Sequence, residues 1–92
     1  MIGSFRNKAL RDFAQSRETR RLPLREHAAR ISRVIRSLDM ARRPSDMDVP
    51  GYVFHPLQGR PPRYSVRVTG NWRITFGFDG EDAVDVDLED YH

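Results

Sequence analysis

The chain has 92 residues, of which 16 are basic, 13 are acidic and none is cysteine, and its formal net charge is +3. This length predicts one domain over residues 1–92, with a core just large enough to fold alone. The lack of cysteine excludes disulfides and thiolate metal sites and favours a reducing, cytoplasmic setting. Neither a signal peptide nor a membrane span is expected, because no apolar run is long enough.

The charges are unevenly distributed along the chain. Residues 1–73 contain all 16 basic residues and 6 acids, whereas residues 74–92 contain 7 acids and no base. All the basic residues except Lys8 are arginines, whose planar guanidinium suits phosphate and carboxylate ligands. A GC-rich genome also enriches arginine, and a solvated basic face is the plain alternative. The basic part makes a polyanion or an acidic protein the first partner to consider.

Two helices are predicted in the first half of the chain. The first covers residues 4–15, where apolar residues recur at helical spacing and Ser4 is the expected N-cap. A charged connector at 16–23 ends in a proline. From Leu24 onward an apolar stripe predicts an amphipathic helix of about four turns, with Arg30 off the stripe. The stripe consists of Leu24, Ala28, Ile31, Val34, Ile35 and Leu38.

The second half of the chain is predicted to form an antiparallel sheet. A turn-rich connector at 42–51 leads into an extended segment at 52–58, which Pro56 prevents from being a regular central strand. Alternating apolar residues predict three strands, at 64–69, 72–78 and 84–89. The turns between them contain the glycine, asparagine and aspartate typical of hairpins. The fold class is therefore α+β, with one sheet face suited to cover by the two helices.

The register of these strands follows from the alternation of side chains, because the apolar sets must lie opposite one another. The expected pairs are Val68–Trp72, Val66–Ile74, Tyr64–Phe76, Phe78–Val84, Phe76–Val86 and Ile74–Leu88. The other face then carries Arg67, Arg73 and Glu89 in one row. Opposed arginines repel unless an anion lies near them. Glu89 can neutralise one and leave the other for a phosphate; the alternative is a solvated ladder of ion pairs.

Acid–base side chains flank this row in the sequence. They are His55, Asp90, Tyr91 and His92. Alternation puts Tyr91 on the arginine-bearing face and Asp90 on the opposite one. With Arg73 they form a set that suits RNA cleavage, which needs a base for the 2′-hydroxyl, an acid for the leaving 5′-oxygen and a cation for the phosphorane. No metal or other cofactor is expected, because the three histidines lack clustered ligands.

Four segments of the chain resemble the HigB-type toxins of the RelE/ParE superfamily of toxin–antitoxin systems. They are MIGSF at 1–5, HPLQG at 55–59, SVRVTGNWRITFGF at 65–78 and DYH at 90–92. The resemblance implies two N-terminal helices packed on a twisted antiparallel β-sheet. It also implies a metal-independent endoribonuclease that cleaves mRNA in the ribosomal A site and inhibits translation. The implied partners are a cognate helix-turn-helix antitoxin of the HigA type, mRNA, and the 70S ribosome with its rRNA, without a membrane.

The resemblance also implies roles for the residues that match the family's motifs. His92 is the expected general base or acid, His55 and Asp90 assist proton transfer, Tyr91 orients or stacks on the substrate, and Arg73 binds the scissile phosphate. The assignment of individual proton transfers stays open between these residues.

The chain departs from the family pattern after the histidine, where relatives often carry lysine. Gln58 stands in this segment, so a lysine role there cannot be carried over. Arg60 and Arg63 are expected to replace it, and with Arg67 they are the predicted RNA- or ribosome-binding residues.

Two other functions are compatible with the sequence. A ParE-like toxin would inhibit a protein target such as gyrase without catalysis, but such a toxin does not need His55 together with the DYH segment. A structural partner would only bind its antitoxin through the basic helices.

Overall fold

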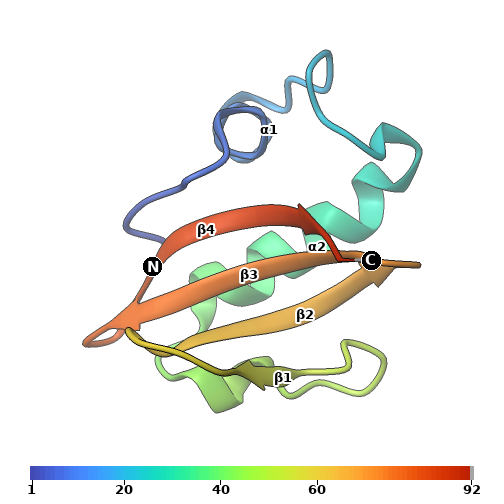
Figure 1. Cartoon of the computed structure of the whole chain (residues 1–92). Coiled ribbons are helices and arrows are strands. Elements are labelled where there is room, and N and C mark those ends of the chain that lie inside the picture. Colours follow the sequence, from blue (N-terminus) through green and yellow to red (C-terminus); the bar gives the residue numbers. More distant parts are fainter. Residues whose placement is uncertain (92) are drawn as a thin grey trace.

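The computed structural model describes residues 1–91, and His92, one of the predicted catalytic residues, lies outside the described residues. The elements in chain order are the helices α1 (Lys8–Ser16), η1 (Arg25–His27), α2 (Ala28–Met40) and η2 (Pro44–Met47), then the strands β1 (His55–Leu57), β2 (Arg63–Thr69), β3 (Trp72–Asp79) and β4 (Asp82–Asp90). The four strands form one antiparallel sheet in the order β1-β2-β3-β4, and α2 crosses one face of it (Figure 1). The predicted α+β class is confirmed.

The N-terminal segment is extended, whereas a helix was predicted from residue 4. Residues 1–6 run along the outer edge of β4, and two parallel bridges join them, Ile2–Ala83 and Phe5–Val86. Helix α1 begins only at Lys8, and the Asn7 side chain caps it by accepting from the Leu10 N–H at 2.9 Å. The prediction of Ser4 as the cap was therefore wrong. The unpaired edge of β4 offers this segment backbone partners that no local pattern reveals.

The second helix also starts later than its apolar stripe predicts. Leu24 has a left-handed backbone with a φ of 59°, and the 3₁₀-helix η1 follows before α2 begins at Ala28. A positive φ is incompatible with a continuous right-handed helix, so the helix predicted from Leu24 is shortened at its start. The stripe residues from Ile31 onward are buried: Ile31, Val34, Ile35 and Leu38.

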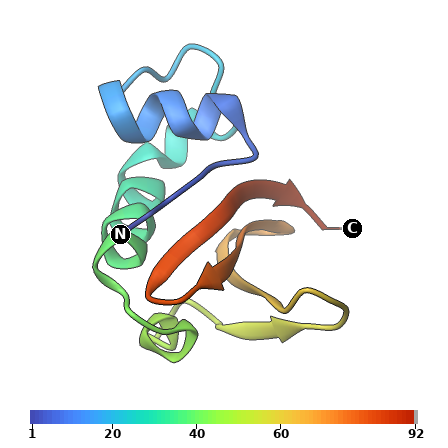
Figure 2. The same cartoon turned by 90° about the vertical axis from the view of Figure 1, so that its left-hand side faces the viewer.

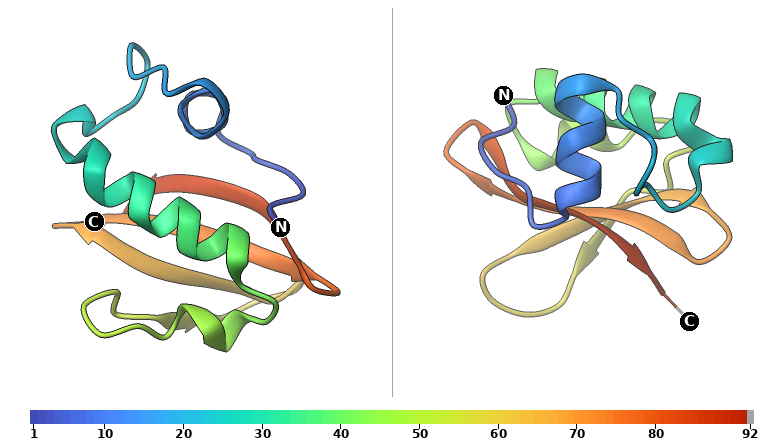
Figure 3. Two further views of the ribbon diagram at one scale, coloured as in Figure 1. Left: turned by 180° about the vertical axis from the view of Figure 1, so that it is seen from behind. Right: turned by 90° about the horizontal axis from the view of Figure 1, so that it is seen from above.

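The core lies between α2 and the sheet, and α1 closes it beside β4 (Figure 3). Leu10 and Phe13 of α1 join it from one side, and Phe76 of β3 is fully buried at its centre. The Phe76 ring lies 5.9 Å from that of Tyr64 and 6.0 Å from that of Phe78, at distances typical of favourable aromatic pairs. The aromatic and aliphatic face predicted for the strands is therefore the face that packs on α2.

The register between β2 and β3 agrees with the prediction except beside the turn. The confirmed pairs are Tyr64–Phe76 and Val66–Ile74, and Arg67 pairs with Arg73 as expected. Trp72, however, pairs with Thr69, so the predicted Val68–Trp72 pair was wrong. The connecting turn has only two residues, the first of which is Gly70 with a φ of 51°. A bulge at Val68 restores the register behind this shorter turn.

The register between β3 and β4 shifts by one residue at Asp85. Ile74–Leu88 and Arg73–Glu89 pair as predicted, but Phe78 pairs with Ala83 instead of Val84, and Phe76, predicted opposite Val86, falls at the shift. Asp85 has a φ of 52°, and its N–H donates to the Ser4 hydroxyl at 2.9 Å. Strand alternation cannot reveal such a bulge, because the extra residue is specified by contacts with the distant N-terminal segment.

Arg30 of α2 joins the helix, a loop and the sheet. Its guanidinium donates to the carbonyls of Val68 at 2.8 Å, Gly51 at 2.8 Å and Arg67 at 3.0 Å, and it lies 5.7 Å from the centre of the Tyr52 ring. Two of these carbonyls belong to the irregular end of β2. Arg30 therefore satisfies backbone acceptors at a bulge, although the sequence pattern put it on the solvated side of the helix.

We expect Arg30→Ala to lower the free energy of unfolding by about 1–3 kcal/mol, because the substitution leaves three backbone carbonyls, one of them in a partly buried hydrogen bond, without this donor. Urea denaturation followed by circular dichroism measures the change. Arg33→Ala is the matched control, since Arg33 is exposed on the same helix and its removal should change stability by less than about 0.5 kcal/mol. Equal losses in the two variants would contradict the role of Arg30.

Candidate functional site

The sheet face that points away from the helices carries most of the predicted site residues. We call it the polar face and define it by two rows of cross-strand neighbours, Arg67–Arg73–Glu89 and His55–Ser65–Thr75–Asp87. Figure 2 shows α1 and α2 together on the other side of the sheet. The polar face is thus open to a large ligand, and it is the candidate functional site.

A hydrogen-bonded chain crosses the polar face from β2 to β4. The Arg63 Nη2 donates to the Thr75 hydroxyl at 3.0 Å, and this hydroxyl in turn donates to the Glu89 carboxylate in a short hydrogen bond. Thr75 is fully buried beneath the two charged groups. The buried Thr75 therefore sets the position of the Arg63 guanidinium, and Glu89 is held at the other end of the hydrogen-bonded chain.

The bulge of β4 lets Arg63 lie in this position, beside Gly77. A Cβ at Gly77 would be 3.9 Å from Arg63 Nη1, an ordinary van der Waals contact. The bulge turns the carbonyl of Asp85 toward Arg63, which donates to it at 2.9 Å. Burial lowers the pKa of Arg63, and the neighbouring Arg6 lowers it further. The guanidinium still stays charged at neutral pH, since an arginine in a protein does not lose its proton.

Arg73 lies on the polar face next to Glu89, yet the two are not an ion pair. Its Nη1 donates to the Gly70 carbonyl at 3.0 Å, which directs the guanidinium toward the β2–β3 turn. Within residues 1–91, no ion pair shorter than 4.0 Å joins Glu89 to Arg73 or Arg67. Glu89 instead interacts through Thr75, so the expected neutralisation of one arginine of the row does not occur by direct contact. The remaining N–H groups of Arg73 can meet an anion.

Tyr91 follows β4 directly and stays attached to the sheet. Its N–H donates to the Asn71 carbonyl at 2.8 Å, which extends the pairing past the end of the strand. Burial raises the pKa of Tyr91, Glu89 raises it further, and Arg63 and Arg73 oppose the shift. The phenol is therefore protonated at neutral pH, and it lies within electrostatic reach of both arginines.

The other predicted residues lie at different positions around this centre. Asp90 pairs with Trp72, so alternation puts it on the opposite face from Arg73, as expected. His55 is exposed on β1, and it lies on the polar face but two strand spacings, roughly 10 Å, from β3. Arg60 is exposed in the loop before β2. The structure thus brings together Arg63, Arg73 and Tyr91, whereas His55 stands further away.

From the sequence, Thr75 was missed as a residue of this site and Glu89 was given the wrong partner. Thr75 reads as an ordinary alternating position of a strand, and Glu89 as a partner of the arginine row. The signal that points to Thr75 is a hydroxyl on the arginine-bearing face between two charged positions. Only the course of the Arg63 side chain shows that the three residues form one chain of hydrogen bonds.

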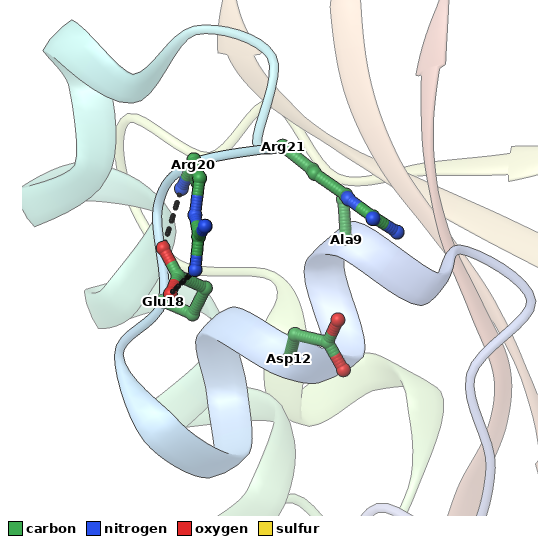
Figure 4. A pocket seen from close by; sticks show the side chains of 5 residues that line it. All are labelled: Ala9, Asp12, Glu18, Arg20 and Arg21. Atoms are coloured by element: carbon green, nitrogen blue, oxygen red, sulfur yellow. Dashed lines mark hydrogen bonds and ion pairs between the residues drawn. The ribbon is translucent and has the colours of Figure 1, made fainter.

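A concave region elsewhere on the surface has a different character. Its lining residues, shown in Figure 4, are Ala9, Asp12, Glu18, Arg20 and Arg21. Glu18 accepts from the Arg20 N–H at 2.8 Å and from its guanidinium at 3.1 Å, and these bonds lower the pKa of Glu18. The pocket is formed by α1 and the loop after it, so it shares nothing with the polar face.

Clustered metal ligands and membrane-spanning helices are two features that the described residues lack. Within residues 1–91, no group of three or more His, Cys, Asp or Glu side chains is arranged to hold a metal ion. None of the helices in this range has the length and apolar character to span a bilayer.

Comparison with known families matches residues 3–92 to the HigB-like toxins, described as the RelE-like toxin of the type II toxin–antitoxin system HigB. The chain belongs to this family. The resemblance inferred from the four sequence segments is therefore confirmed. Among curated proteins, the chain is similar to Endoribonuclease HigB of Proteus vulgaris, with 36% identity over 93 aligned residues that cover 100% of both chains. As a HigB-family member the chain is the toxin of a type II pair, whose other member is an antitoxin.

Proposed function

We propose that this toxin is a ribosome-dependent endoribonuclease that cleaves mRNA in the A site and so inhibits translation. The observation that carries the proposal is the cluster of Arg63, Arg73 and the protonated Tyr91 on an open sheet face. The Proteus vulgaris relative is named as an endoribonuclease, which supports the same conclusion. A broad, open sheet face suits an extended strand of nucleic acid held by its phosphates.

The chemistry that these residues support is transesterification by the ribose. The 2′-hydroxyl loses its proton and attacks the adjacent phosphorus, and the leaving 5′-oxygen gains a proton. Arg73 stabilises the charge on the phosphorane, as preorganised donors do at developing charges. Tyr91 orients the substrate and can give a proton, and His92, His55 and Asp90 take part in proton transfer. This scheme needs no metal ion.

The partners follow from the family and from the charge of the chain. We infer that the antitoxin is a HigA-type helix-turn-helix protein and that the toxin acts in the cytoplasm on the 70S ribosome. Arg60, Arg63 and Arg67 contact mRNA or rRNA phosphates in this proposal. Arg67 is exposed at the β2 end of the row, where a phosphate would relieve its repulsion with Arg73.

Adding the purified protein to a translation extract and mapping RNA ends tests the proposal. We expect new ends in translated mRNA and none when ribosomes are omitted. His92→Ala should lower the rate of their formation by about 10²–10⁴-fold, the usual contribution of a general acid or base. Intact mRNA together with a loss of DNA supercoiling activity would favour the ParE-like alternative.

A further inference from the structure

We propose that Thr75 and Glu89 are positioning residues, which hold the Arg63 guanidinium in place so that its free donors bind a phosphate of the RNA. The inference rests on the proposed function for the identity of the ligand. It adds two residues that touch no substrate themselves, and it assigns Arg63 to a preorganised phosphate-binding site on the polar face.

The hydrogen bonds of Arg63 divide its guanidinium into a fixed part and an open part. Both described bonds start from Nη2, one to the Thr75 hydroxyl at 3.0 Å and one to the Asp85 carbonyl at 2.9 Å. Nη1 and Nε take part in none of the side-chain hydrogen bonds within residues 1–91. An arginine has five N–H donors in a planar fork, so fixing Nη2 orients the remaining donors without using them.

Thr75 is suited to hold the guanidinium because it cannot move away. Its side chain is fully buried in the central strand, and its hydroxyl accepts from Arg63 while it donates to Glu89. The carboxylate of Glu89 thus fixes the direction of the hydroxyl proton and leaves the oxygen lone pairs for Arg63. The charge of Glu89 also raises the pKa of Arg63 against the effect of burial.

A preorganised guanidinium binds phosphate more tightly than a mobile one, because the side-chain entropy is lost on folding and not on binding. The Cα atoms of Arg73 and Thr75 are about 7 Å apart along β3. The guanidinium of Arg63 lies at Thr75, so Arg63 and Arg73 are placed to bind successive phosphates along an RNA strand. The polar face would then hold a phosphate next to the scissile one.

Thr75→Val and Thr75→Ser test this role, with a 2′-O-methyl RNA oligonucleotide as an uncleavable probe. Valine keeps the shape of threonine without the hydroxyl, and we expect the affinity for the probe to fall on the order of tenfold. The slope of log affinity against log salt should become shallower by about 0.7, the change expected when the protein neutralises one phosphate fewer on a single strand. Serine restores the hydroxyl and should restore both quantities. Ser65→Ala is the matched control, because Ser65 is a buried hydroxyl directly across the strand pair from Thr75.

A double-variant cycle separates positioning from a general structural effect. In an Arg63→Ala background, Thr75→Val should cause no further loss of affinity, because Thr75 acts through Arg63. Glu89→Gln is a second route to the same result if the valine variant proves unstable in thermal denaturation. It should weaken binding in the parent protein only. The inference would be overturned if Thr75→Val still lowered the affinity in the Arg63→Ala background. It would also be overturned if the parent protein did not bind the probe at low salt.

These binding measurements also separate the inference from the proposed function. If the toxin leaves mRNA intact in the translation extract but the Thr75 and Arg63 effects on probe binding are coupled, the nuclease proposal fails and the phosphate site stands. If cleavage is observed and Thr75→Val binds and cleaves like the parent protein, the phosphate site fails and the nuclease stands.

Discussion

Arg73→Ala is expected to lower the rate of mRNA cleavage by about 10²–10³-fold at saturating substrate, because a donor aimed at the charge of the transition state is lost. The protein should remain folded, since the described hydrogen bonds of the Arg73 side chain go only to nearby backbone carbonyls, those of Gly70 in the turn and Trp72 at the start of β3. The measurement is the initial rate of new RNA ends in a translation extract, together with the thermal denaturation midpoint of each variant.

Arg67→Ala is the matched control for this prediction. Arg67 lies directly opposite Arg73, but it is exposed and belongs to the predicted binding residues. Its removal should weaken binding evenly across RNA sequences and reduce the salt dependence of binding, because the protein then neutralises one phosphate fewer. The rate at saturation should stay close to that of the parent protein. If both variants lose the same rate at saturation, Arg73 has no special place in the chemistry.

Phe76→Ala is expected to lower the free energy of unfolding by about 3–5 kcal/mol. Phe76 is 0% exposed, and its ring contacts those of Tyr64 and Phe78 in the centre of the sheet. A small domain has a total stability of about 5–15 kcal/mol, so the loss would remove a large share of it. Urea denaturation of the purified protein measures it.

Phe78→Ala removes the same type of side chain from a half-buried position of the same strand. We expect a smaller loss, because less apolar surface is returned to water and the cavity can open to solvent. Comparing Phe76→Ala with Phe78→Ala therefore measures how burial affects the loss of stability when the same side chain is removed. A larger loss for Phe78→Ala would mean that the packing centre lies nearer to the β3–β4 hairpin than the burial of Phe76 indicates.

The elements of the fold could largely be predicted because their signals are local. Alternation along β2 and β3 identified the cross-strand pairs Tyr64–Phe76 and Val66–Ile74 without a structure. The apolar stripe of α2 was equally clear from Ile31 onward. Prediction failed where a distant segment decides the local conformation. Residues 1–6 are extended because the edge of β4 accepts them, and the register shifts where Asp85 meets Ser4.

For the candidate site, the sequence predicted which types of residue share a cross-strand row on one face of the sheet. The row Arg67–Arg73–Glu89 followed from alternation alone, and the sequence showed His55, Asp90, Tyr91 and His92 as an acid–base set beside it. The resemblance to HigB-type toxins added the individual roles of these four residues, which stay predictions. Alternation says which face a side chain points to, but it does not say which partner a long side chain reaches. Glu89 was therefore expected beside an arginine of its row, whereas its carboxylate is hydrogen-bonded to Thr75.

The sequence by itself determined the two faces of the sheet and the charge that one of them carries, because side-chain direction in a strand repeats every two residues. Tertiary structure decided how that charge is arranged. Arg63 lies across Gly77 and meets a carbonyl exposed by the bulge at Asp85, and both depend on contacts between segments far apart in the chain. The arginine-bearing strand face thereby becomes a site in which one guanidinium is held in place by the buried hydroxyl of Thr75.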